Sequence, residues 1–113
     1  MVESKFQSQL VKEIKKTLPG CYVFKTDPSQ VQGFPDLLIL YKKKWAALEV
    51  KASATANHRP NQDHHVKACN EMSFGSFIYP ENKEEVINGM VRFLKGLPRR
   101  KSCPLLTEQS SLE

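Results

Sequence analysis

The stretch GFPDLLILYKKKWAALEVK, residues 33–51, decides the fold. Its two apolar runs, 37–41 and 45–50, have the length and the aliphatic and aromatic content of buried β-strands. The short basic segment 42–44 between them favours the turn of an antiparallel hairpin. Charged residues stand at the ends of both strands, where charge is costly unless it is paired or used. These residues are Asp36, Glu49 and Lys51.

The register of this hairpin decides whether the charged side chains meet. A two-residue turn at 42–43 places Asp36 opposite Glu49, and directly opposed residues have Cβ atoms about 4.5–5.5 Å apart on one face of a sheet. Glu49 and Lys51 are two residues apart and share that face, whereas Val50 points into the opposite layer. A turn of another length would shift the register, and a shift of one residue would exchange the faces.

Two carboxylates and an amine on one face are the groups that a metal-dependent hydrolytic site needs. Mg²⁺ prefers oxygen ligands and keeps several waters, so one or two protein carboxylates suffice. We expect Asp36 and Glu49 as metal ligands, with the backbone carbonyl of Val50 placed to add another. The ion would activate a bound water, and Lys51 would orient that water or offset charge on the attacked phosphate. The structural alternative is that Asp36 caps the strand and Glu49 pairs with Lys51 on a solvated surface.

The remaining segments complete an α/β pattern. The expected elements are a helix over 3–18, a strand over 21–24, a helix after Pro60, a strand over 74–79 and a helix over 82–94. The first helix carries a buried stripe at Phe6, Leu10, Ile14 and Leu18. The order α-β-β-β-α-β-α predicts an α/β domain with a central mixed sheet of about four strands flanked by helices. We expect the domain to span 1–97 and the polar segment 98–113 to form a flexible tail.

Composition narrows the class of protein. The chain has 113 residues, which suits one domain, and its net charge of +5 favours a polyanionic partner such as DNA. The cysteines are odd in number and widely spaced, as in reduced thiols of a cytoplasmic protein. No apolar run is long enough to span a bilayer, so no membrane partner is expected. His64 and His65 are adjacent and diverge on a helix, which argues against a shared zinc ion.

The charged residues also resemble a known signature. Pro35-Asp36, a gap of 12 residues and then Glu49-Val50-Lys51 resemble the motif of the PD-(D/E)xK nucleases. Gly33 and the strand pattern are similar to the small VRR-NUC and Holliday-junction-resolvase-like branches, and the element order matches over about residues 3–80. The chain lacks a Val-Arg-Arg triplet, after which one branch is named.

The resemblance implies a restriction-endonuclease-like core and a set of roles. Asp36 and Glu49 would bind Mg²⁺ or Mn²⁺, and Lys51 would be the catalytic lysine. The family often adds an acid on the first helix, which Glu3 fits as a further ligand. It also tends to carry a glutamine at the start of the helix after the lysine strand, and Gln62 matches.

The function expected from this resemblance is a metal-dependent endodeoxyribonuclease. A domain this small has little surface for reading sequence, so structure-specific cutting of branched DNA such as Holliday junctions is the leading expectation. Two symmetric cuts would call for a homodimer, and a nuclease of this size would suit a phage. The alternatives are a restriction-type or repair nuclease with another DNA substrate, a non-catalytic nucleic-acid-binding module of the same fold, and a scaffold protein.

Overall fold

The computed structural model describes residues 2–97, so the expected tail at 98–113 lies outside the described residues. Its elements follow one another as α1 (Glu3–Thr17), β1 (Tyr22–Lys25), β2 (Leu37–Tyr41), β3 (Lys44–Val50), α2 (Pro60–Met72), β4 (Phe74–Ile78), the 3-10 turn η1 (Pro80–Asn82) and α3 (Lys83–Leu94). The predicted order is confirmed. Within the described part, no helix combines the length and apolar character required to cross a membrane.

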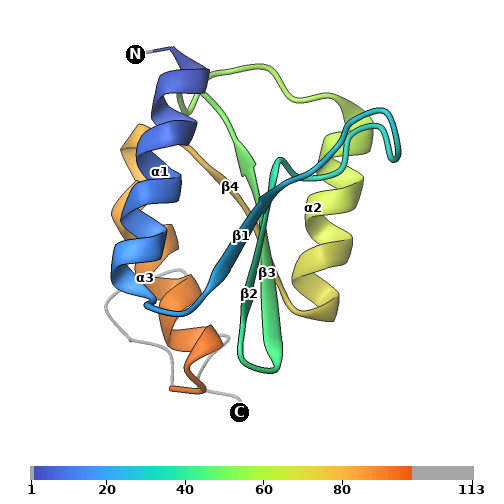
Figure 1. Ribbon diagram of the computed structural model, residues 1–113. Coiled ribbons are helices and arrows are strands. Elements are labelled where there is room, and N and C mark those ends of the chain that lie inside the picture. The colour runs from blue at the N-terminus through green and yellow to red at the C-terminus, as the bar shows by residue number, and fades with distance from the viewer. Residues whose placement is uncertain (1, 98–113) are drawn as a thin grey trace, which may run out of the picture.

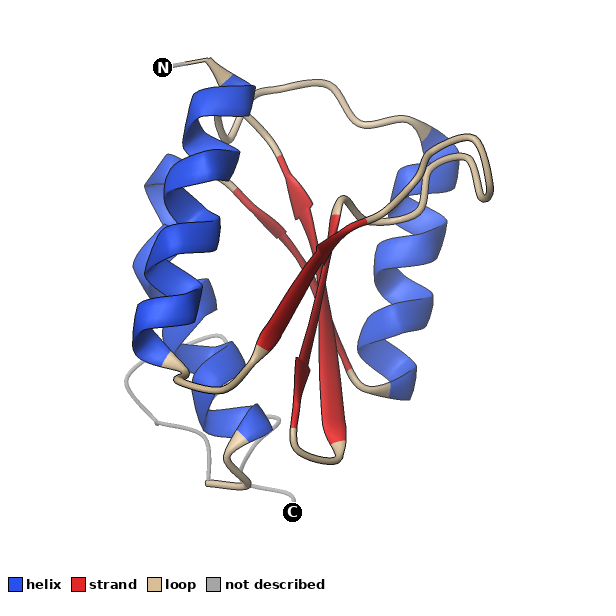
Figure 2. Cartoon of the chain, viewed as in Figure 1, coloured by secondary structure: helices blue, strands red, loops and turns tan. Residues whose placement is uncertain are grey.

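The sheet has the strand order β1-β2-β3-β4. β1, β2 and β3 are antiparallel neighbours, and β4 runs parallel to β3. The parallel pair requires a crossover, which α2 supplies. Helices α1 and α3 cover one face of the sheet, and α2 lies on the other (Figures 1 and 2).

The β2–β3 hairpin has the register predicted from its two-residue turn. Leu37 pairs with Leu48, and Tyr41 pairs with Lys44. Lys42 in the turn has φ 56, in the left-handed region that hairpin turns of this length require. The next residues in this register are Asp36 and Glu49. Their side chains therefore leave the sheet on the same face.

Small differences at element ends have local causes. β1 starts one residue later than predicted because the Cys21 N–H donates to the Leu18 carbonyl at 3.0 Å and still belongs to the turn after α1. β4 ends one residue early because the Tyr79 N–H turns to the Asn82 side chain at 2.8 Å. Asn82 lies in η1, so α3 begins at Lys83.

The hydrophobic core fills the space between the sheet and the α1/α3 layer. It contains the predicted stripe of α1 and the inward side chains of all but the first strand: Phe6, Leu10, Ile14, Leu18, Leu37, Ile39, Ala46, Leu48, Val50, Phe74 and Ile78, with Val86, Ile87, Met90 and Leu94 from α3. Val50 thus points away from Glu49, as predicted.

On the other face, α2 lies close to the sheet and buries fewer side chains than the α1/α3 layer does. α2 buries only Val66 and Cys69. Gly75 of β4 makes the close approach possible, because a Cβ there would lie 2.7 Å from the Val66 carbonyl oxygen. The start of α2 consequently lies over the end of β3, where the charged residues stand.

Candidate active site

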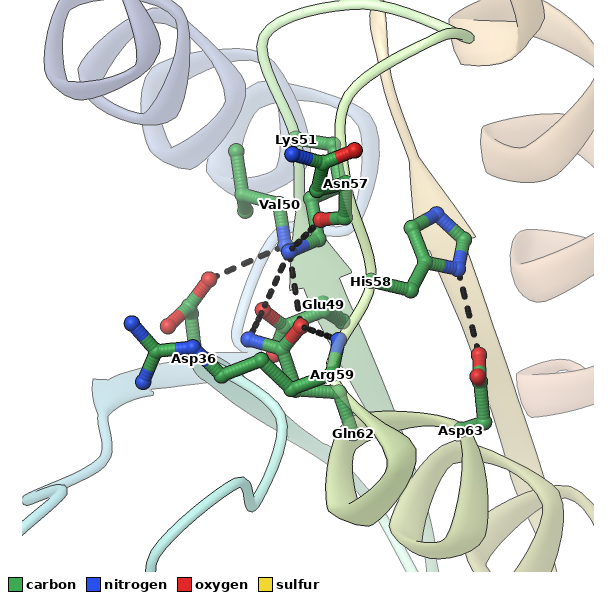
Figure 3. A network of polar contacts seen from close by, with 9 residues as sticks. All are labelled: Asp36, Glu49, Val50, Lys51, Asn57, His58, Arg59, Gln62 and Asp63. Atoms are coloured by element: carbon green, nitrogen blue, oxygen red, sulfur yellow. Dashed lines mark hydrogen bonds and ion pairs between the residues drawn. The ribbon is translucent and has the colours of Figure 1, made fainter.

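The predicted charged residues come together beside the start of α2 (Figure 3). The Asp36 carboxylate accepts a hydrogen bond from the Val50 N–H at 3.0 Å, which fixes it against the end of β3. The Lys51 Nζ lies 3.8 Å from the Glu49 Oε2. A site composed of one residue before β2 and two at the end of β3 is what the hairpin register predicts.

Gln62 bridges Glu49 at the end of β3 and Lys51 directly after it. Its Nε2 donates to the Glu49 Oε2 at 3.0 Å, and its Oε1 accepts from the Lys51 Nζ at 2.8 Å. The same Oε1 accepts from the Arg59 N–H at 3.1 Å, an interaction that anchors the start of α2. The family resemblance predicted Gln62 as a site residue. In the structure its amide holds the Glu49 carboxylate and the Lys51 amine in one orientation.

Glu49 and Lys51 are buried despite their charge. Their exposed fractions are 3% and 8%. Lys51 makes a further hydrogen bond to the Asn57 carbonyl oxygen at 3.0 Å. Buried charges are destabilising unless they are paired and hydrogen-bonded, so this arrangement contradicts the alternative of a solvated surface pair.

The pKa values of both carboxyl groups, Asp36 and Glu49, are raised. Burial, the neighbouring Asp36 charge and, to a smaller degree, Glu3 raise the pKa of Glu49 to about 7, although Lys51 acts in the opposite direction. Burial also raises the pKa of Asp36, against the lowering effects of the Val50 N–H and Lys51. Both carboxylates are therefore harder to ionise here than in water, mainly because burial removes their hydration.

The residues present fit a divalent cation. The Glu49 Oε1 is buried without a hydrogen-bond partner among the described residues. The Val50 N–H faces Asp36, and because the N–H and C=O of one strand residue point to the same side, the Val50 carbonyl is directed toward the Asp36 side of β3. Across residues 2–97, no three His, Cys, Asp or Glu side chains are grouped closely enough to hold an ion. Two carboxylates with waters suit Mg²⁺ or Mn²⁺ far better than zinc.

Glu3 lies near this site but outside the ligand group. It is the first residue of α1 and is exposed. Its charge contributes to the raised pKa of Glu49, yet it does not join Asp36 and Glu49 in a three-residue group. Its role as a further ligand stays a prediction.

A cleft of about 190 Å³ opens over the carboxylates. It is lined by Pro28, Gln32, Gly33, Phe34, Asp36, Glu49, Arg59, Asn61 and Gln62. The β1–β2 connector forms one wall and is fixed to α2, because the Asn61 Nδ2 donates to the Gln32 carbonyl at 3.2 Å. Gly33 has φ +85, and a Cβ there would lie 2.5 Å from the Asn61 side chain. Asn61 was not singled out from the sequence, because only the fold brings it to the connector.

The basic and histidine residues of the region have different tasks. Arg59 lines the cleft. His58 stacks on Phe77 with ring centroids 4.0 Å apart and contacts Asp63 at 3.1 Å, so it covers β4. Away from the site, Glu13 pairs with Lys83 at 3.0 Å and links α1 to α3.

Comparison with known proteins identifies the fold. No family model matches the sequence, and no curated protein matches it. Among solved structures, a "VRR_NUC domain protein" is similar with a TM-score of 0.65 at 15% identity, covering 88% of this chain and 98% of that one. A "VRR_NUC domain" is similar with a TM-score of 0.61 at 19% identity, covering 80% and 94%. The chain has the α/β restriction-endonuclease-like fold of these domains, as the sequence resemblance predicted.

Proposed function

We propose that this chain is a VRR-NUC-type nuclease that hydrolyses phosphodiester bonds of DNA with the help of Mg²⁺ or Mn²⁺. The observation that carries the proposal is the pair of carboxylates, Asp36 and Glu49, that lines the cleft, with the buried Glu49 Oε1 lacking a hydrogen-bond partner within residues 2–97. Two carboxylates repel a phosphate unless a cation stands between them. A protein that only bound nucleic acid would gain nothing from this pair.

Each residue has a distinct part in the proposed reaction. Asp36, Glu49 and the Val50 carbonyl would hold the ion, and Glu3 would be a further ligand. When bound, the ion supplies Lewis-acid stabilisation of the phosphate and lowers the pKa of a water. Gln62 and the Asn57 carbonyl hold the Lys51 ammonium beside Glu49, where it would offset charge that develops on the phosphate.

Arg59 adds a second positive group on the opposite side of the carboxylates (Figure 3). It stands at the start of α2 and lines the cleft. A guanidinium there matches the oxygens of a phosphate and can hold it in two places. We assign Arg59 to phosphate binding rather than to the chemical step.

Branched DNA, such as a Holliday junction, is the proposed substrate, cut by a homodimer inside the cell. The cleft is small and the net charge is +5, so binding would depend on backbone contacts and DNA shape more than on base sequence. A homodimer would place two such sites symmetrically. The alternative is a nuclease of the same chemistry that cuts another DNA structure.

A cleavage panel tests the proposal. The protein is incubated with a four-way junction, a flap, a linear duplex and single-stranded DNA, in Mg²⁺, Mn²⁺ or EDTA. We expect metal-dependent cleavage that is lost in Asp36→Asn and Glu49→Gln and retained in Glu71→Gln, an exposed acid of α2 outside the cleft. Binding without cleavage in every metal would instead identify a non-catalytic module.

A further inference from the structure

An exposed apolar surface lies on the α2 face of the sheet, outside both the core and the cleft. It consists of Tyr22, Phe24 and Leu40, with exposed fractions of 66%, 46% and 37%, and we name it the aromatic strip. Val23 packs against the core, so its neighbours on β1 point to the opposite face. α2 packs on β3 and β4 and leaves this half of the face open.

The aromatic strip continues into the cleft. Tyr22 pairs with Leu40, and Phe24 pairs with Leu38. The ladder extends further, because the Thr26 N–H donates to the Asp36 carbonyl at 2.9 Å. Since a two-residue step along a strand is roughly 7 Å, Phe24 stands one step and Tyr22 two steps from the row that carries Asp36. The strip and the metal-binding residues thus share one surface.

The charges around the strip match a polyanion. Lys42 and Lys43, both exposed, stand in the hairpin turn beside Leu40. Lys25 shares the face of Val23, and Lys44 turns to the Phe93 carbonyl at 3.2 Å, so neither belongs to the strip. The sequence contains no acid from Leu37 to Leu48. Two copies of the chain packed through this surface would bring like charges together, which is unfavourable. Three partly exposed side chains also offer much less than the roughly 800 Å² per partner of a stable protein interface.

We infer that the aromatic strip is a stacking surface for unpaired nucleotides beside the cleaved phosphate. The rings of Tyr22 and Phe24 are stacked, with centroids 6.2 Å apart. Aromatic rings exposed on a sheet stack nucleobases with little regard to sequence, and adjacent lysines hold the backbone. The inference rests on the proposed action on nucleic acid and narrows the branched substrate: one with unpaired nucleotides next to a duplex, such as a flap, is preferred over a fully paired four-way junction.

Equilibrium binding in EDTA tests this inference without catalysis. Fluorescence anisotropy compares a linear duplex, the same duplex with a short unpaired tail, and the duplex with an abasic tail that keeps the phosphates. We expect the unpaired tail to raise affinity about tenfold or more and the abasic tail to lose most of that gain. Tyr22→Leu/Phe24→Leu keeps an apolar surface without rings and should abolish the preference, whereas Tyr22→Trp/Phe24→Trp should preserve it. Met72→Leu, at an exposed apolar residue of α2, is the matched control.

Several results would overturn the inference. Equal affinity for the duplex and the tailed duplex, an abasic tail that binds as well as a normal one, or a leucine double variant that keeps the preference would each exclude stacking. A wild-type dimer that Tyr22→Ser/Phe24→Ser dissociates in sedimentation would make the strip an interface between copies. If the nuclease proposal alone is wrong, the tail preference remains while cleavage is absent in every metal. If this inference alone is wrong, metal-dependent cleavage remains without the preference.

Discussion

The two faces of β3 differ in what burial does to them. Leu48 and Val50 point toward α1 and α3 into the hydrophobic core, while Glu49 and Lys51 point toward α2 into a polar network. All of them are buried. On the core face, burial removes apolar surface from water and stabilises the fold. On the α2 face, it raises the pKa of Glu49, and one oxygen of that carboxylate has no hydrogen-bond partner in the described part of the chain. Burial on the core face stabilises the fold, whereas burial on the α2 face costs stability but holds charged groups where a reaction can use them.

The largest expected effect is on the polar face and is a loss of catalytic activity. Glu49→Gln and Asp36→Asn keep side-chain shape and remove the negative charge that a cation needs. We expect each to lower the rate of metal-dependent cleavage about a thousandfold, because the charge stabilisation from a bound ion amounts to several kcal/mol. Single-turnover rates in Mg²⁺, with circular dichroism as a check of folding, measure this. Nearly wild-type rates in either variant would contradict the division between the faces.

On the core face, Leu48→Ala should change stability and leave the chemistry of the folded protein intact. Leu48 is fully buried, and removal of a buried leucine side chain costs about 2–5 kcal/mol of unfolding free energy. Urea denaturation measures the loss. At a low temperature where the variant is folded, the cleavage rate per folded molecule should match the wild type. A stable variant with greatly reduced cleavage would show that the two faces are not separable.

Gln62→Ala should have an intermediate effect, because Gln62 orients groups and does not replace them. It loses the hydrogen bonds to Glu49 and Lys51. Residues that orient metal ligands typically contribute about 10–100-fold to metal affinity or activity. We expect the midpoint of the Mn²⁺ titration to move to higher concentration by this factor. Gln62→Glu keeps the size but adds a negative charge beside Glu49, so it should also shift the pH profile of cleavage.

The smallest expected effect is a pH dependence of stability without metal. Because the pKa of Glu49 rises from 4.5 to about 7 on folding, the folded chain binds a proton more tightly than the unfolded chain in this window. Stability contributed by this group is therefore greatest below pH 4.5 and falls as the pH rises through 7. Asp36 acts with the same sign. The melting temperature of Glu49→Gln minus that of the wild type should increase with pH, and added Mg²⁺ should stabilise the wild type most above pH 7. A difference that does not vary with pH would refute the raised pKa.

The side chains on the core face of β3 could be predicted from the sequence more completely than the contacts on its polar face. The core face followed from hydrophobic spacing, as the α1 stripe at Phe6, Leu10 and Ile14 shows. On the polar face, the hairpin register brought Asp36 to Glu49, because a two-residue turn leaves one pairing. The contacts of Gln62 with Glu49 and Lys51, and of Asn61 with the β1–β2 connector, depend on how α2 docks on Gly75. Periodicity within a segment carries no information about that docking.

Paramagnetic broadening by Mn²⁺ tests the central claim most directly. In two-dimensional NMR spectra of the isotope-labelled protein, substoichiometric Mn²⁺ should broaden the backbone amide signals of Asp36, Glu49, Val50 and Lys51 first. The amides of the hairpin turn at the far end of β3 should stay sharp, and Glu49→Gln should lose the effect. Broadening centred elsewhere in the domain, or unchanged in that variant, would contradict a metal-binding site formed by Asp36 and Glu49.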